Sequence, residues 1–304
     1  MTRQSFFARC GLSIILATAA CSDSTAPTTG SAGFESQVSA DLAPSAGEDV
    51  ATDYNFYATA SGSATGATFA RLMPTGGSSG SSTGIFMQRT PAPSPSGLTA
   101  SAIVAWINPA CVYTSATSNF VCPTLTWMGH SLSVSYTLFD SLGVAQSQYS
   151  PTLTASVALV VSDTGAVAYT WNNNSFADTS SHHRNVTLSN LLGSPDTLHI
   201  WNGVGSTAIH SVRSGQITKT YQLSSNDTTT NVAIRQPHGL NPYPLSGTIV
   251  RNYSVVRTKQ ASDTTTHSAT RRVVVTFNGT ADVPMTVGTE TYSLNLDSHR
   301  VTKQ

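Results

Sequence analysis

Charged residues are scarce in this chain. Of its 304 residues only 10% are Asp, Glu, Lys or Arg, and the formal net charge is +0, whereas an ordinary soluble domain is about 25% charged. Glu and Lys, which favour long helices, occur three times each. A duplex nucleic-acid binder needs surplus Lys and Arg to displace counterions. The composition therefore excludes that class and a long helical protein.

Long apolar runs are also missing. No stretch of 18 or more apolar residues occurs, so no membrane-spanning helix is predicted. Hydroxyl residues are abundant instead, with 43 Ser and 43 Thr. A Thr-rich, Val-rich and turn-rich chain is typical of β structure, and we place it outside the cytoplasm.

The N-terminus has the three parts of an export signal. Arg3 and Arg9 precede an apolar stretch over 11–20, which ends in small residues before Cys21. This pattern resembles a bacterial lipoprotein signal, although Thr18 replaces the usual Leu. The resemblance implies that Cys21 becomes a lipidated N-terminus. The alternative is ordinary secretory cleavage near Ala19 or Ala20.

The residue after the cysteine refines the predicted location. Ser22 resembles the residue found in lipoproteins that are sorted to the outer membrane. We therefore expect a cell-envelope protein that is lipid-anchored at the outer membrane, with the membrane as one partner.

Four cysteines leave one possible pair in the mature chain. Cys10 departs with the signal and Cys21 carries lipid, so Cys111 and Cys122 remain. Export implies an oxidising compartment, and we predict a disulfide between them. A two-thiol metal site is the alternative.

The segment before the β-region is predicted to contain one short helix, at about 46–58. Ser45 and Glu48 fit a capping box, and Asp49 and Asp53 place negative charge near its start. Val50, Tyr54 and Tyr57 form one apolar stripe. The expected organisation is a signal peptide (1–20), a lipidated flexible tether (21–45), a short helix (46–60), a Gly/Ser/Pro-rich linker or loop (61–97) and a β-domain (98–304).

From residue 98 onward, apolar and polar residues alternate between turn signals. Period-two alternation predicts strands with one buried face, and the lack of intervening amphipathic helices predicts antiparallel pairing. We expect turns at 162–165 and near 263–266. The fold class is therefore all-β, an antiparallel β-sandwich or open barrel with one short N-terminal helix.

Four segments resemble a group of uncharacterised all-β bacterial lipoproteins. They are Asn241-Pro-Tyr-Pro-Leu-Ser-Gly247, the hairpin ending at 273–280, the Cys111/Cys122 pair and Trp201-Asn-Gly203. The resemblance covers roughly 100–300. It implies location and β class, and it carries no activity or site residue.

No pattern of catalytic residues stands out. Six acids lie beside Ser, Thr, Gly or Pro, a context in which Asp favours turns: Asp140, Asp163, Asp196, Asp227, Asp263 and Asp297. The string over 76–80 matches a serine-hydrolase motif but lies in linker sequence rather than at a strand-to-helix turn. His182 and His183 point to opposite faces if they lie in a strand. We predict a non-enzyme with no catalytic residue, metal or cofactor.

Charge is distributed unevenly along the chain. Residues 21–178 contain nine acids and two bases, whereas 179–304 contain six acids and eleven bases. Five bases lie on the two arms of one predicted hairpin, in which Arg257 would face Arg272. The alternatives are an anion-binding patch and a solvated edge that discourages strand addition. The patch would consist of Arg251, Arg257, Lys259, Arg271 and Arg272.

These observations lead to one main hypothesis and two alternatives. The main one is a non-catalytic, membrane-anchored binding or envelope structural module, whose partner is an envelope glycan, lipid or protein and not a nucleic acid. The first alternative is a carrier of lipid or another hydrophobic ligand in an open barrel. The second is a secreted hydrolase.

Overall fold

The computed structural model describes ten ranges of the chain. They are 38–40, 42–47, 49–51, 53–54, 111–127, 129–150, 152–171, 174–192, 198–235 and 242–304. The predicted signal peptide, Cys21 and the Gly/Ser/Pro-rich linker over 61–97 lie outside these residues.

Within the described residues, fourteen strands form a single sheet. All of their pairings are antiparallel, and the path runs β1-β2-β4-β6-β7-β8-β9-β10-β11-β12-β13-β14, with β3 and β5 paired to β4. The strands are β1 (Val112–Thr114), β2 (Asn119–Val121), β3 (Leu125–Trp127), β4 (His130–Asp140), β5 (Ala145–Gln146), β6 (Thr154–Trp171), β7 (Asn174–Ser189), β8 (Leu198–Ser214), β9 (Thr218–Arg235), β10 (Ser246–Gln260), β11 (Thr264–Thr276), β12 (Asp282–Val287), β13 (Glu290–Asn295) and β14 (Val301–Lys303).

This arrangement confirms the all-β antiparallel class with one short N-terminal helix. The described strands belong to one open sheet rather than to two facing sheets. Along β9, buried and exposed residues alternate from Tyr221 to Thr230, as the period of two requires. The long strands thus have one buried face, which contacts the helix. We call this the inner face, and we call the opposite, mostly exposed face the outer face.

The predicted turn at 162–165 is wrong, because β6 continues through it. Ser162 pairs with Ser133 and His183, and Thr164 pairs with Ser131 and Ser181. Backbone pairing on both sides holds these turn-forming residues in an extended conformation, since tertiary pairing overrides local preference.

The hairpin of β10 and β11 forms, but its register differs from the prediction. Gln260 pairs with Thr264, so the turn centres on 261–263, and Arg257 faces His267. Arg272 faces Asn252 instead. Arg272 is five residues from His267, the partner of Arg257, and side chains an odd number of residues apart on a strand point to opposite faces. Arg257 and Arg272 consequently lie on opposite faces of the sheet.

The helix lies earlier in the chain than predicted. The described helical residues are 38–40, 42–47, 49–51 and 53–54. The helix therefore begins within the predicted tether, and Ser45 is not its cap. Pro44 and Gly47 lie inside it and cost about 3 and about 1 kcal/mol respectively in a helix interior. Burial offsets this, since Leu42 and Val50 are both fully buried.

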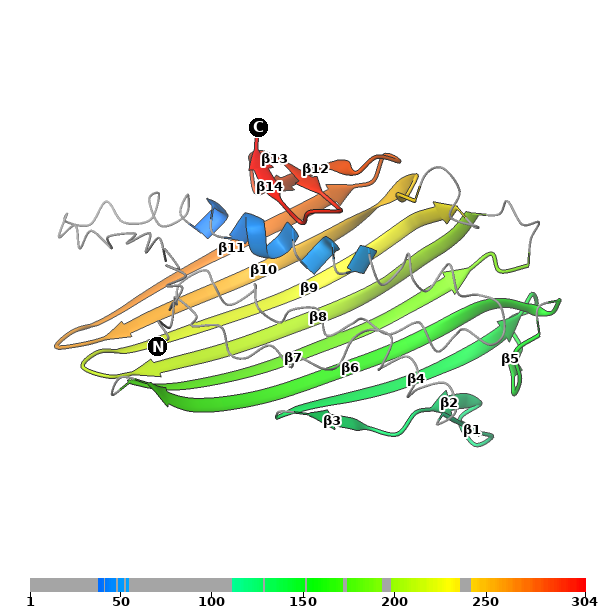
Figure 1. The fold of residues 1–304 in the computed structure, drawn as a ribbon, viewed down its shortest axis with the longest axis horizontal. Helices are drawn as coiled ribbons and strands as arrows, with labels where there is room; N and C mark the ends of the chain where they lie inside the picture. The colour runs from blue at the N-terminus through cyan, green and yellow to red at the C-terminus, as the bar shows by residue number, and fades with distance from the viewer. Residues whose placement is uncertain are drawn as a thin grey trace, which may run out of the picture.

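The helix lies across one face of the sheet (Figure 1, blue). One side of the helix contacts the long strands through Arg251 of β10. Elsewhere Gly47 approaches the other end of the sheet, where an added Cβ would lie 2.3 Å from Val301 and 3.2 Å from Leu294. The hydroxyl of Tyr54 donates to the carbonyl of Pro242 at 3.4 Å. Within the described residues, no helix is long and apolar enough to cross a membrane.

Candidate functional site

A buried cluster of charges joins the helix to the inner face of the sheet. Arg184 of β7, Asp227 of β9 and Arg251 of β10 lie in one row across the strands, and the helix contributes Asp49 and Asp53. Arg251 donates a hydrogen bond from Nη2 to Asp53 Oδ2 and another from Nη1 to Asp49 Oδ2, the latter at 3.2 Å. Arg184 Nη1 donates to Asp227 Oδ1 at 2.8 Å, and its Nε lies 3.6 Å from Asp53 Oδ1. We call these five residues the ion cluster.

Gly205 makes room for the pair formed by Arg184 and Asp227. It lies between them in the row, on β8. A Cβ at this position would lie 2.3 Å from Arg184 Nη1 and 2.7 Å from Asp227 Oδ1. The ion pair therefore crosses the sheet over a residue that has no side chain.

The cluster contains three carboxylates but only two guanidinium groups. Burial raises the pKa of Asp227, and repulsion from Asp53 and Asp49 adds to the rise, against the attraction of Arg251 and Arg184. For Arg251, burial alone would lower the pKa, but the attraction of the carboxylates, Asp53 first, outweighs it and holds the pKa well above its ordinary value. The fully buried guanidinium thus stays charged.

The next row of the inner face has polar residues at its centre, between Asp163 of β6 and Arg271 of β11. The hydroxyl of Tyr253 donates to Asp49 Oδ2 at 3.1 Å, and burial raises the pKa of this tyrosine. His182 Nδ1 lies 3.2 Å from Thr207 Oγ1, and burial lowers the pKa of its imidazole. Ser225 is 3% exposed, and its hydroxyl has no hydrogen-bond partner among the described residues.

The structure separates the five residues of the predicted anion patch. Arg251 is 0% exposed and belongs to the ion cluster, so it cannot contribute to a surface patch. Arg271 lies on the inner face, where its Nε donates to Ser39 Oγ of the helix at 2.6 Å. Arg257 and Lys259 follow Arg251 along that face, and Arg272 points outward.

The disulfide prediction is confirmed, and two predicted turn acids are wrong. Cys111 and Cys122 are bonded. Asp140 does form a turn, since its Oδ1 accepts from the backbone N–H of Leu142 and Val144. Asp163 and Asp227, however, lie in the middle of β6 and β9.

The ion cluster was not predicted. Asp49 and Asp53 were expected to favour the start of a helix, but they lie near its described end and pair with the sheet instead. One sequence signal pointed to buried charges: Asp227 and Arg251 each occupy positions that alternate in step with the buried residues of their strands. Alternation alone did not show that the two strands are neighbours.

The outer face of the long strands is almost free of charge. Three successive rows contain Ser162, His183, Ser206, Asn226, Asn252 and Arg272; Thr164, Ser181, Ala208, Ser224, Ser254 and Thr270; and Val160, Asn185, Val204, Thr228, Val250 and Val274. We call these residues the hydroxyl face. Arg272 alone among them carries a permanent charge, and most of them are exposed.

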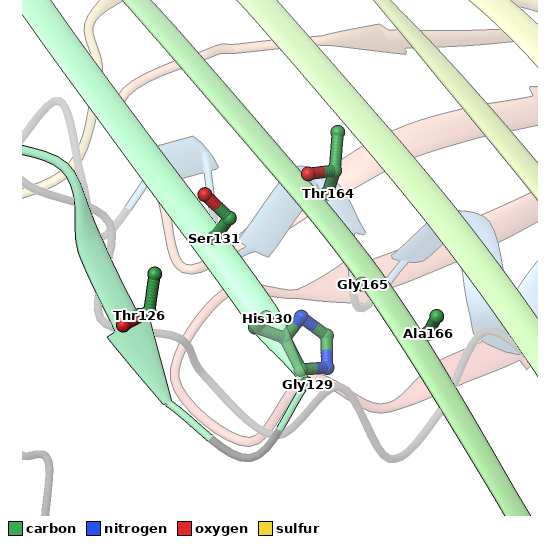
Figure 2. A pocket seen from close by; sticks show the side chains of 7 residues that line it. All are labelled: Thr126, Gly129, His130, Ser131, Thr164, Gly165 and Ala166. Carbon is green, nitrogen blue, oxygen red and sulfur yellow. The ribbon is translucent and has the colours of Figure 1, made fainter.

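A pocket of about 570 Å³ lies near one edge of the sheet, where β3, β4 and β6 meet (Figure 2). His130 lines it, together with the hydroxyl residues Thr126, Ser131 and Thr164. The imidazole lies over Gly165, where an added Cβ would be 2.4 Å from its Cε1. His130 Nδ1 also lies 3.5 Å from Asp163 Oδ1.

The described histidines do not gather into a site. His182 faces the helix, whereas His183 and His210 point outward, as adjacent strand residues must alternate. Within the described residues, no group of three or more His, Cys, Asp or Glu side chains could hold a metal ion.

Comparison of the chain with protein-family models, with curated proteins and with solved structures finds no match.

Proposed function

We propose that this protein is a lipid-anchored, non-catalytic binding module of the cell envelope, and that its hydroxyl face binds an uncharged polysaccharide. The observation that carries the proposal is the near absence of charge over three rows of strand residues, most of which are exposed. A surface domain ordinarily interleaves Lys, Arg, Asp and Glu over such an area.

The chemistry of this face suits a neutral glycan. Eight of its 18 residues are Ser or Thr and three are Asn, and these side chains can donate and accept hydrogen bonds. Neighbouring strands lie about 4.8 Å apart, and successive side chains on one face of a strand about 6.8 Å apart. Short Ser and Thr side chains also lose less conformational entropy on binding than long charged ones. No buried charge has to be compensated, which would otherwise weaken binding.

The position of the helix suits presentation of this face. Helix 38–54 docks on the inner face, where Ser39 contacts Arg271. A chain coming from a lipidated Cys21 would enter the domain on that side, and the hydroxyl face points the opposite way. Carriage of a hydrophobic ligand on the inner face would instead require the helix to leave, because its Leu42 and Val50 are fully buried there.

A charge placed on the hydroxyl face tests the proposal. Asn226→Glu should weaken binding to insoluble neutral polysaccharides at least about tenfold, because a carboxylate would be desolvated without a partner. Sedimentation of the protein with the polysaccharide measures this. The matched control is Leu142→Glu, at a turn residue that is 86% exposed and lies off this face. Equal binding by the two variants, or no binding by the unmodified protein, would contradict the proposal.

The proposed anchor has its own test. Cys21→Ser should move the protein from the membrane fraction to the soluble fraction, because the acyl chains would be lost. Fractionation followed by immunoblotting measures this, and membrane association that persists in Cys21→Ser argues against a lipid anchor.

A further inference from the structure

Helix 38–54 is bound to the sheet much as a separate peptide would be. Its hydrogen bonds to Arg251, Tyr253 and Arg271 join residues that are 198 to 232 positions apart. Seven of its apolar side chains, from Val38 to Tyr54, are at most 6% exposed. Pro44 and Gly47 disfavour an isolated helix, so the segment depends on the sheet for its conformation.

The chain does not require this helix to dock on its own sheet. Residues 55–110 join the helix to Cys111, and 56 residues can span about 180 Å when extended. We propose that helix 38–54 also docks on the sheet of a second copy of this chain, which gives helix-exchanged dimers.

A second copy is the partner that these contacts specify. The inner face offers Arg184 and Arg251 for two carboxylates four residues apart, Asp49 and Asp53. At β14, Val301 approaches Gly47 so closely that an added Cβ there would lie 2.3 Å from its side chain. An identical chain supplies all of these groups, and a two-fold exchange satisfies both copies at once.

Concentration sets the balance between the two forms. Linking two binding partners in one chain gives an effective concentration of about millimolar for docking within that chain. The single-chain form therefore dominates in dilute solution, and exchange increases when copies are concentrated. The exchange is independent of the proposed glycan binding.

Complementary charge reversal tests the exchange with full-length chains. Asp53→Arg places a cation against Arg184 and Arg251, and Arg251→Asp places an acid against Asp49 and Asp53. Because like charges then face each other, the helix of either variant cannot dock on its own sheet or on the sheet of an identical chain. When the two are mixed, each helix finds a complementary sheet in the other chain. Size-exclusion chromatography with light scattering should show single chains of 31.8 kDa before mixing and twice that mass afterwards.

The control is one chain that carries both substitutions, which should be monomeric and folded. A mixture that stays single-chain while this control is folded would overturn the proposal. Dimers formed by Asp53→Arg alone would also overturn it, because they would show a contact that does not need the ion cluster.

Isotopic mixing covers the case in which a reversed chain does not fold. Unlabelled and ¹⁵N-labelled unmodified chains are combined, warmed to just below unfolding, cooled at about millimolar concentration and diluted. Native mass spectrometry should then detect dimers that contain one chain of each kind. Single-chain masses alone, at every concentration tried, would overturn the proposal.

Discussion

At the scale of single residues, Arg251 connects the helix to the sheet through two buried ion pairs. Its guanidinium is 0% exposed and binds Asp49 and Asp53 of the helix. A buried charge without its partner is far more costly than an exposed one, so each member of the ion cluster depends on the others.

Replacement of this guanidinium should therefore be strongly destabilising. Arg251→Met keeps most of the side-chain volume but leaves two carboxylates without their main partner, and it should lower the free energy of unfolding by about 3–5 kcal/mol. Urea denaturation measures the loss. Arg272→Met, on the exposed face of the neighbouring strand, is the control and should change stability by less than about 0.5 kcal/mol. Similar losses in the two variants would be inconsistent with a stabilising ion cluster.

His182 should make stability depend on pH. Burial lowers the pKa of its imidazole below the ordinary value of 6.5, so between these two values the unfolded chain binds more protons than the folded one. Stability is then complete above pH 6.5 and falls as the pH drops through this window. Thermal unfolding from pH 7 to pH 5 should show a falling Tm that is less steep in His182→Gln. His183→Gln, on the exposed outer face, should retain the full slope; identical slopes in all three proteins would refute the assignment.

At the scale of elements, the helix and the edge strands are stabilised by different means. The helix contains Pro44 and Gly47 and is held by burial and ion pairs. The short strands β1 and β2 have three residues each and are linked at Cys111 and Cys122. Such short strands gain little from pairing alone, so the covalent link supplies the missing constraint.

Loss of the disulfide should loosen this edge selectively. The Cys111→Ser, Cys122→Ser double variant removes a cross-link worth up to about 3 kcal/mol in the chain-entropy view. Amide hydrogen exchange should become faster over 111–127, whereas β8 to β10 should keep their protection, because they pair with long strands on both sides. Uniformly faster exchange throughout the sheet would show instead that this hairpin supports the whole fold.

At the scale of the whole molecule, sequence separation suggests an order of folding. The long strands pair mainly with their neighbours in sequence, whereas the helix bonds to residues about 200 positions away. Closing so long a loop costs entropy before any contact forms. We therefore expect the sheet to form first and the helix to dock late.

Kinetics distinguishes this order from simultaneous folding. Asp53→Asn weakens helix docking, so it should raise the unfolding rate severalfold and leave the folding rate within about twofold. Stopped-flow measurements across urea concentrations give both rates. Val255→Ala, in the buried centre of β10, is the comparison and should slow folding. A slower folding rate for Asp53→Asn would place the helix in the folding nucleus.

Local patterns predicted the elements better than their contacts. Alternation predicted the antiparallel strands, and the cysteine arithmetic predicted the disulfide. The turn at 162–165 and the hairpin register were wrong, since both depend on which residues of neighbouring strands pair. Arg251 was assigned to a surface patch because its sequence position does not show that the helix covers that face.

The sequence by itself determined the class of this protein. Period-two alternation, few charges and many hydroxyl residues specify antiparallel strands with one polar face, because these properties act over a few neighbouring residues. Only the tertiary structure decided that Asp49 and Asp53 meet Arg184 and Arg251, and that helix 38–54 extends through Pro44. Those outcomes depend on burial between segments about 130 to 200 residues apart, where the loss of water makes each charge require a partner.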